Sequence, residues 1–216
     1  MKLLFSGEQF FDVFAQYNQA VWPAQILLNL IAVAAIVLLR FGGRSKDRVI
    51  SSIVAFLWAW MAIAYHFAFF TRINPAAWLF GAAFIAGAFG FVWAGVIHNG
   101  VRFHAGRGIQ ASIGSILIGF ALVCYPILSF ALGRKYPAVP TFGLPCPTTI
   151  FTLGVLLFLT RPAPRSVFFV PLVWSAVGSV AAFELGVFED LGLLAAGVIG
   201  CIAVVFDRRT GGQHSG

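Results

Sequence analysis

Long apolar segments separated by short polar links are the main pattern of this sequence. Most of the segments reach the length of about 20 residues that a helix needs to cross the hydrocarbon core of a bilayer. The links contain residues that end or begin helices, such as Gly42-Gly43 and Asn74-Pro75; asparagine suits an N-cap and proline the first helical position. The pattern therefore predicts seven transmembrane helices, over residues 21–41, 49–71, 75–97, 109–133, 144–160, 166–184 and 189–206.

The residues before the first apolar segment follow a different pattern. Ser6 and Gln9 have the spacing of a capping box at the start of a helix. Aromatic residues then recur at helical spacing opposite acidic and amide side chains, which favours an amphipathic helix in the membrane interface over a frayed polar leader. We therefore expect an N-terminal interfacial helix within residues 1–20, a transmembrane domain over 21–207 and a short cytoplasmic tail over 208–216.

The composition indicates the same class of protein. Hydrophobic residues make up 60% of the 216-residue chain and charged residues only 10%, whereas soluble globular domains carry about a quarter charged residues. The expected fold is therefore an all-α polytopic membrane protein without a separate soluble domain. Cys124, Cys146 and Cys201 lie far apart and have neither a CxxC nor a zinc-binding spacing.

The positive charges alternate along the chain, and this alternation predicts the orientation of the helices. Basic residues follow the first, third, fifth and seventh segments, namely Arg40, Arg44, Lys46, Arg48, Arg102, Arg107, Arg161, Arg165, Arg208 and Arg209. By the positive-inside rule, we expect the N-terminus in the periplasm and the C-terminus in the cytoplasm of a bacterial inner membrane. Because topology accounts for the net charge of +7, nucleic acid is not an expected partner.

Two ridges of small residues are candidates for close helix packing, because small side chains let helix backbones approach each other in a membrane. The ridges consist of Ala82, Ala86 and Gly90 in the third segment, and of Gly192, Ala196 and Gly200 in the seventh.

Most polar side chains of the apolar segments lie at a similar depth, in the outer half of the predicted bundle. Unpaired polar groups are costly in hydrocarbon, so these side chains should face the bundle interior or a wet cavity. We therefore expect one ligand pocket, open to the periplasm. Its candidate residues are Gln25, Asn29, Tyr65, His66, Tyr125, Cys146, Thr148, Thr149, Ser179 and Glu184.

Several of these residues allow more than one interpretation. His66 is either an interior histidine hydrogen-bonded to Tyr125 or Asn29, or a ligand-binding or proton-relay group. Glu184 is either a solvated carboxylate at a helix end or a partner of His66 or Arg72. Asn29 also fits a hydrogen bond between helices, which is typically worth less than about 2 kcal/mol.

The sequence Pro145-Cys146-Pro147-Thr148 begins the fifth segment, which is short for a membrane span. If Pro145 is the first helical residue, two of the N–H groups that a helix start leaves unpaired are absent, because proline has none. This favours a helix that starts in a nonpolar layer with its N-terminus facing a ligand. A soft-metal site needs several thiolate or imidazole ligands, and only His66 could join Cys146, so no metal or cofactor is expected.

Three stretches resemble a family of bacterial multi-pass membrane proteins described only as a domain of unknown function: EQFFDVFAQYNQAVWP (8–23), YHFAFFTRINPAAWLFG (65–81) and FGLPCPTTIFTLG (142–154). Some members of that family are labelled permeases, and the resemblance implies no substrate or site residues. The similar starts of the first and fifth segments also suggest a parallel 3+1+3 repeat, the architecture of SWEET-type transporters.

Three functions remain open from the sequence. The first is a small-solute permease, whose inward opening would lie at Ser51, Ser112 and Ser115. The second is a sensor or accessory subunit that binds a periplasmic ligand or lipid without transport. The least favoured is an intramembrane enzyme using His66 and Glu184 as acid and base, because no catalytic motif accompanies them. The expected partners are the lipid bilayer, a small-molecule ligand and further copies of the chain as a homo-oligomer.

Overall fold

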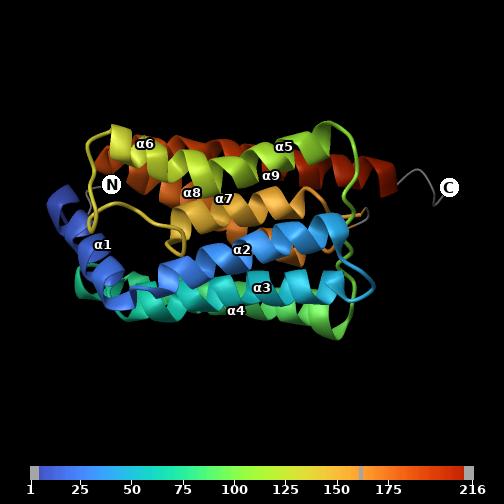
Figure 1. Cartoon of the computed structure of the whole chain (residues 1–216), viewed down its shortest axis with the longest axis horizontal. Helices are drawn as coiled ribbons and strands as arrows, with labels where there is room; N and C mark the ends of the chain where they lie inside the picture. The colour runs from blue at the N-terminus through green and yellow to red at the C-terminus, as the bar shows by residue number, and fades with distance from the viewer. Residues whose placement is uncertain (1–4, 161–162, 212–216) are drawn as a thin grey trace.

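The computed structural model describes residues 5–160 and 163–211, without the side chains of 207–211. Figure 1 shows long helices side by side, with the N-terminal helix α1 (Gly7–Val21) lying across one end of the bundle. The other helices are α2 (Ala24–Phe41), α3 (Lys46–Trp60), α4 (Ala77–Phe91), α5 (Ile109–Gly119), α6 (Tyr125–Ala131), α7 (Pro145–Leu156), α8 (Ser166–Leu185) and α9 (Leu191–Gly211).

Several of the long helices include wider, π-helical turns. One follows α3 at Met61–Phe67, one follows α4 at Val92–Ile97, and one joins α5 to α6 at Phe120–Cys124. Short 3₁₀ turns lie at Phe70–Arg72 and Phe188–Asp190.

Among the described residues, six helical stretches are long and apolar enough to cross a membrane, and the chain is therefore an all-helical multi-pass membrane protein. They are Ala24–Phe41, Lys46–Arg72, Ala77–Ile97, Ile109–Ala131, Ser166–Leu185 and Phe188–Phe206. Helix α9 extends to Gly211, into the expected tail, whose residues 212–216 lie outside the described part of the chain.

The fifth expected segment is the exception. Its helix, α7, has only 12 residues, or about 18 Å at 1.5 Å per residue, so it is shorter than the expected 144–160. The residues after it leave the helix and pair with the 102–104 link, where His104 N–H donates to the Phe158 carbonyl and Thr160 N–H to the Arg102 carbonyl, both at 2.8 Å. Residues 158–160 therefore form extended backbone, paired with the 102–104 link, where the sequence predicted the last helical turn.

Helix α7 lies in the middle of the bundle, with α2 and α3 on one side and α5 and α9 on the other (Figure 1), and it also packs against α8. Every residue of α7 except Cys146 is buried. A helix enclosed in this way needs apolar or internally bonded side chains on all faces. Thr152 meets this need because its hydroxyl donates to the Thr148 carbonyl (2.8 Å) and accepts from the Trp58 indole (3.1 Å).

Close contact between α5 and α7 depends on two facing glycines. A Cβ placed on Gly114 would lie 2.8 Å from the Gly154 carbonyl oxygen, and one placed on Gly154 would lie 3.0 Å from the Gly114 carbonyl oxygen. Both distances are shorter than van der Waals contact. The two backbones can therefore approach this closely only because neither residue has a side chain.

The two expected packing ridges have different outcomes. Ala196 is fully buried, and a Cβ on Gly192 or Gly200 would collide with Phe120 or Leu172, so the ridge of α9 faces the bundle. The prediction for α4 is wrong within this chain: Ala82 and Ala86 are exposed, and space is open around Gly90. The packed face of α4 carries Gly81, Phe84, Gly87 and Ala88 instead, because the large rings of Phe84 and Phe91 turn this face inward.

Hydrogen bonds connect two segments at one end of the bundle and cap the start of α1. At the end opposite α1, the buried Asp47 carboxylate accepts the Phe103 N–H (2.9 Å) and lies 3.9 Å from the Arg102 guanidinium. At the start of α1, Ser6 and Gln9 form the expected capping box, with each side chain accepting the other's backbone N–H. Of the basic residues used for orientation, Arg161 lies outside the described residues, as do the side chains of Arg208 and Arg209.

We predict that Gly154→Ala destabilises the protein by about 1–3 kcal/mol, the usual cost of overpacking a core. The added methyl group would press against α5 in a place where neither backbone can move without disturbing the other helix. The control is Gly119→Ala on α5, where nothing lies within 4 Å of the new Cβ. The measurement is the unfolding midpoint of the purified protein, and equal effects of the two substitutions would contradict the prediction.

Candidate functional site

A cavity of about 410 Å³ lies at the α1 end of the bundle. Its walls come from α1, the π-helical turn after α3, the start of α4, the beginning of α7, the second half of α8 and the turn before α9. Some of its lining residues, including Ala76, Val177 and Val180, are exposed on the outside of the bundle. The cavity therefore reaches the surface between α4 and α8.

The π-helical turns place two tyrosines in the cavity wall. Tyr65 lies within the turn Met61–Phe67, and Tyr125 follows directly after the turn Phe120–Cys124. A π-helical turn holds an extra residue and so changes the direction of the side chains that follow, which is why such turns are frequent at functional sites.

Proline begins α7 at the inner edge of the cavity. Pro145 is the first helical residue, which was one condition for the interpretation of this motif, and Pro145, Cys146 and Pro147 all line the cavity. The first regular helical bond of α7 runs from the Thr148 N–H to the Leu144 carbonyl (3.3 Å). The two prolines thus present ring carbons where other residues would present bare N–H groups.

Two adjacent carboxylates lie buried beside the cavity, in the 3₁₀ turn that precedes α9. Glu189 accepts a hydrogen bond from Ser129 (2.5 Å) and lies 3.2 Å from the Arg134 guanidinium, so its charge is paired. Asp190 accepts a hydrogen bond from the Tyr125 hydroxyl (2.5 Å) and lines the cavity. Within the described ranges, His, Cys, Asp and Glu side chains form no group of three that could hold a metal ion.

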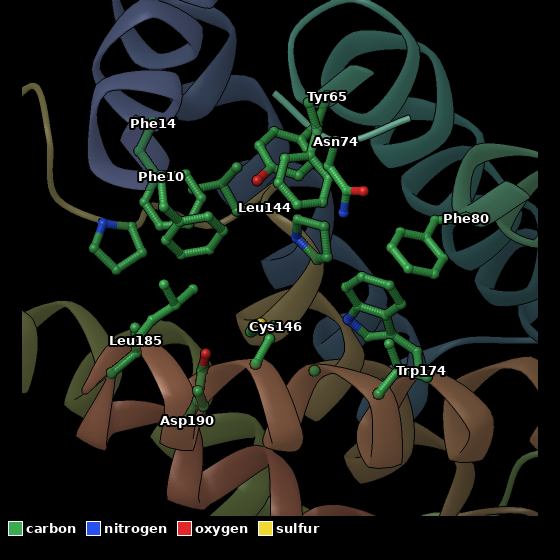
Figure 2. A pocket seen from close by; sticks show the side chains of 18 of the residues that line it. Phe10, Phe14, Tyr65, Asn74, Phe80, Leu144, Cys146, Trp174, Leu185 and Asp190 are labelled. Atoms are coloured by element: carbon green, nitrogen blue, oxygen red, sulfur yellow. The ribbon is translucent and has the colours of Figure 1, made fainter. Parts of the chain in front are cut away.

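The cavity is otherwise aromatic and aliphatic. Figure 2 shows Phe10, Phe14 and Tyr65 on one side, facing Asp190, Cys146 and Trp174 on the other. The Trp174 indole N–H is buried and lacks a hydrogen-bond partner among the described residues. An unpaired buried donor is costly, so this N–H marks a place where a polar group of a ligand would be stabilised.

The link between α6 and α7 closes the cavity at the end of the bundle, and Asn18 of α1 holds this link in place. The Asn18 amide donates to the carbonyls of Pro137 (2.6 Å) and Val139 (2.7 Å) and accepts from the Thr141 hydroxyl (2.7 Å). The side chain of one buried asparagine thus fixes three residues of the link.

Tyr17 makes a second connection between α1 and this link. Its hydroxyl accepts from the Trp60 indole (2.8 Å) and donates to the Gly143 carbonyl (3.4 Å). Burial raises the pKa of the Tyr17 phenol above its ordinary value, so the group remains a neutral hydrogen-bond donor.

Three of the residues expected to share one pocket line this cavity: Tyr65, Tyr125 and Cys146. Thr148 and Thr149 are fully buried further along α7. They do not line the cavity, and the Thr149 hydroxyl lacks a partner in the described part of the chain.

His66 lies behind the cavity wall. Its ring centroid is 5.2 Å from that of Trp174 and 4.6 Å from that of Phe84, and both of its nitrogens lack hydrogen-bond partners among the described residues. The expected hydrogen bond to Tyr125 or Asn29 is therefore wrong, because aromatic rings surround the imidazole.

The remaining candidates lie apart from the cavity. Gln25 donates to the Asn18 carbonyl (2.9 Å), and Asn29 donates to the Gln25 carbonyl (2.8 Å), so these two amides belong to the start of α2. Ser179 donates to a carbonyl one turn earlier in α8, and Glu184 is exposed near the end of that helix.

Sequence reasoning missed Asp190 and Trp174 as cavity residues and Asn18 as its support. Residues 189 and 190 stand at the beginning of the seventh expected segment, where charged side chains usually face water, so nothing in the sequence indicated that they turn inward. A signal for Trp174 was present: it lies in the middle of its segment, whereas tryptophans of the aromatic belt lie near segment ends. No comparable signal marks Asn18, whose partners are more than a hundred residues away in the sequence.

We predict that Asn18→Ala releases the link over residues 137–141 and lowers stability by about 1–3 kcal/mol, because the carbonyls of the half-buried Pro137 and Val139 lose their donor. Amide hydrogen exchange of that link should rise. Asn29→Ala is the control, because its amide bonds only within the start of α2 and is half-buried. Unchanged exchange in Asn18→Ala would show that other contacts hold the link.

Comparison with known proteins finds a match to a family model, but none to an individual protein. No curated protein and no solved structure matches the chain. The model of a family of unknown function, DUF6064, matches residues 7–215, which is nearly the whole chain. The chain therefore belongs to the family of unknown function DUF6064.

Proposed function

We propose that this protein binds an amphipathic small molecule in the cavity at the α1 end of the bundle, as a membrane sensor or accessory subunit. The lining supports an apolar ligand body, because phenylalanine, proline and aliphatic side chains form most of it. The few polar groups, among them Tyr65, Trp174 and Asp190, would orient one polar end.

The observation that carries this proposal is the closure of the cavity towards the opposite end of the bundle. Helix α7 begins at the cavity, and its buried residues from Pro147 to Leu156 fill the space beyond it. A ligand that enters the cavity therefore meets a packed core, which favours binding over passage.

Entry from the bilayer is the second part of the proposal. Val177 and Val180 line the cavity and are also exposed on α8, within a stretch long and apolar enough to span a membrane. Their apolar side chains give the cavity a mouth that suits an amphiphile dissolved in lipid. A water-soluble solute would find few polar groups there.

A small-solute permease is the second candidate function. A hollow at the opposite end of the bundle supports it, because Ser112, Ser115 and Phe158 are among the residues that line it. Hollows therefore lie near both ends of α7, and a movement of this helix would have to connect them during transport. Of the three serines at which the sequence predicts an inward opening, Ser112 and Ser115 line this hollow, whereas Ser51 is buried and donates to the Asp47 carbonyl.

We also propose the orientation that the basic links indicate. The links near Lys46, Arg102 and Arg107 lie at the end opposite α1, and the positive-inside rule assigns that end to the cytoplasm of a bacterial inner membrane. The cavity would then open in the periplasmic half.

Seven passes, with α7 as the short one, fit this orientation, as does α1 lying in the membrane interface. The 3+1+3 repeat and homo-oligomers remain predictions.

We predict that a photoreactive alkyl alcohol with a 12-carbon chain and a diazirine group, added to membranes that contain the protein, labels residues 143–149. Val177→Trp should reduce this labelling at least fivefold, because the indole would fill the mouth of the cavity. Val173→Trp is the matched control, since it adds the same side chain one turn earlier on the exposed face of α8, outside the cavity. Mass spectrometry of the labelled peptides gives the measurement.

Equal labelling of the two variants, or none in the wild type, would refute binding in this cavity. Swelling of proteoliposomes in small neutral solutes separates the two candidate functions. Swelling no faster than that of empty liposomes supports a binding role, and faster swelling that Val177→Trp abolishes supports the permease.

A further inference from the structure

The buried Asp190 carboxylate, one of the polar groups of the cavity, indicates which kind of polar end the ligand carries. Its side chain projects into the cavity from the 3₁₀ turn that precedes α9, next to the Cys146 thiol (Figure 2). Only 4% of Asp190 is exposed. The carboxylate accepts from the Tyr125 hydroxyl (2.5 Å) and from the Cys146 thiol, and because a carboxylate has about four acceptor sites, capacity remains towards the cavity.

No ion pair within the described part of the chain includes Asp190. The nearby cation, Arg134, is engaged by Glu189, with both carboxylate oxygens 3.2 Å from the guanidinium. Arg134 also donates to the Gly186 carbonyl and stacks 4.3 Å above the Phe11 ring, so these contacts hold it outside the cavity lining. A buried carboxylate without a cation favours a positively charged partner.

Aromatic rings surround the space in front of Asp190. Phe10, Phe14, Tyr65, Phe70 and Phe80 line the cavity together with Trp174. Tyr65 and Phe70 stack with their ring centroids 5.5 Å apart, and Phe80 meets Trp174 edge to face at 5.4 Å. The negative faces of such rings attract organic ammonium groups, and cages of this kind recognise quaternary ammonium ligands.

The charges of the lining also exclude the opposite kind of ligand. Among the described residues that line the cavity, Asp190 is acidic and none is Lys, Arg or His. An anionic head group would meet the Asp190 carboxylate without a compensating cation. A fatty acid or an alkyl phosphate is therefore disfavoured.

We infer that the cavity recognises an amphiphilic organic ammonium ion, with Asp190 as its counter-ion, the aromatic rings around its head group and its alkyl chain leaving between α4 and α8. This inference rests on the proposed binding function and names its ligand class. The ammonium group could belong to a free alkyl amine or to the head group of a zwitterionic lipid. The phosphate of such a lipid would have to remain at the mouth of the cavity, away from Asp190.

The experiment uses three photoreactive probes with the same 12-carbon diazirine chain and different heads: trimethylammonium, alcohol and phosphocholine. Labelling of residues 143–149 is measured in wild-type membranes at increasing probe content. We expect the ammonium probe to reach half-saturation at a concentration at least tenfold lower than the alcohol probe. Equal half-saturation of the ammonium and phosphocholine probes would assign the ammonium group to a lipid, and stronger labelling by the ammonium probe would assign it to a free amphiphile.

Asp190→Asn removes the charge and keeps an oxygen that can accept from Tyr125. It should bring the ammonium and alcohol probes to within about twofold of each other. Glu184→Gln is the matched control, because it removes an exposed carboxylate from the same end of the bundle and should leave the tenfold preference intact.

The wild-type comparison decides the inference even where Asp190→Asn does not fold. Equal labelling by the ammonium and alcohol probes overturns the ammonium inference and leaves the binding function standing. Labelling by none of the probes overturns the binding function itself. A preference for ammonium that survives in folded Asp190→Asn would assign recognition to the rings and overturn the role of Asp190.

Discussion

The enclosure of α7 is the constraint on which the rest of the structure depends. A helix surrounded by other helices in a membrane has no water or lipid headgroups to pair its polar groups, so each one needs a partner inside the protein. Thr152 has Trp58, and Thr148 accepts from the Gly143 N–H (3.0 Å). The two prolines at its start reduce the number of N–H groups that need partners.

The position of α7 also determines where the protein can be hollow. Because the facing glycines at 114 and 154 bring α5 against α7, the middle of the bundle is closely packed. Space remains beyond the first residue of α7, where the link from α6 bends over the end of the bundle and α1 covers it. The cavity is thus a consequence of a helix that is too short to fill the length of its neighbours.

Charge at the α1 end is arranged around this cavity. Glu189 and Arg134 neutralise each other, and Phe11 of α1 covers the guanidinium. Asp190, the next residue after Glu189, turns towards the cavity and accepts from the Tyr125 phenol and the Cys146 thiol. Two neighbouring carboxylates therefore have different environments: Glu189 is paired with Arg134, and Asp190 supplies an acidic group to the cavity lining.

The sequence by itself determined the helical membrane class, the approximate position of each apolar segment, the capping box of α1 and Pro145 as the start of α7. These features depend on local composition, spacing and the chemistry of single residues, which neighbours in the sequence are enough to define. Only the tertiary structure decided which polar residues meet, since the direction of a side chain depends on helix rotation and on π-helical turns. In the folded protein, Asp190 and Trp174 line the cavity, aromatic rings surround His66, and Gln25 and Asn29 lie apart from the other candidate residues. Depth in the membrane can be read along the chain, whereas the face of a helix that turns inward is set by packing against partners far away in the sequence.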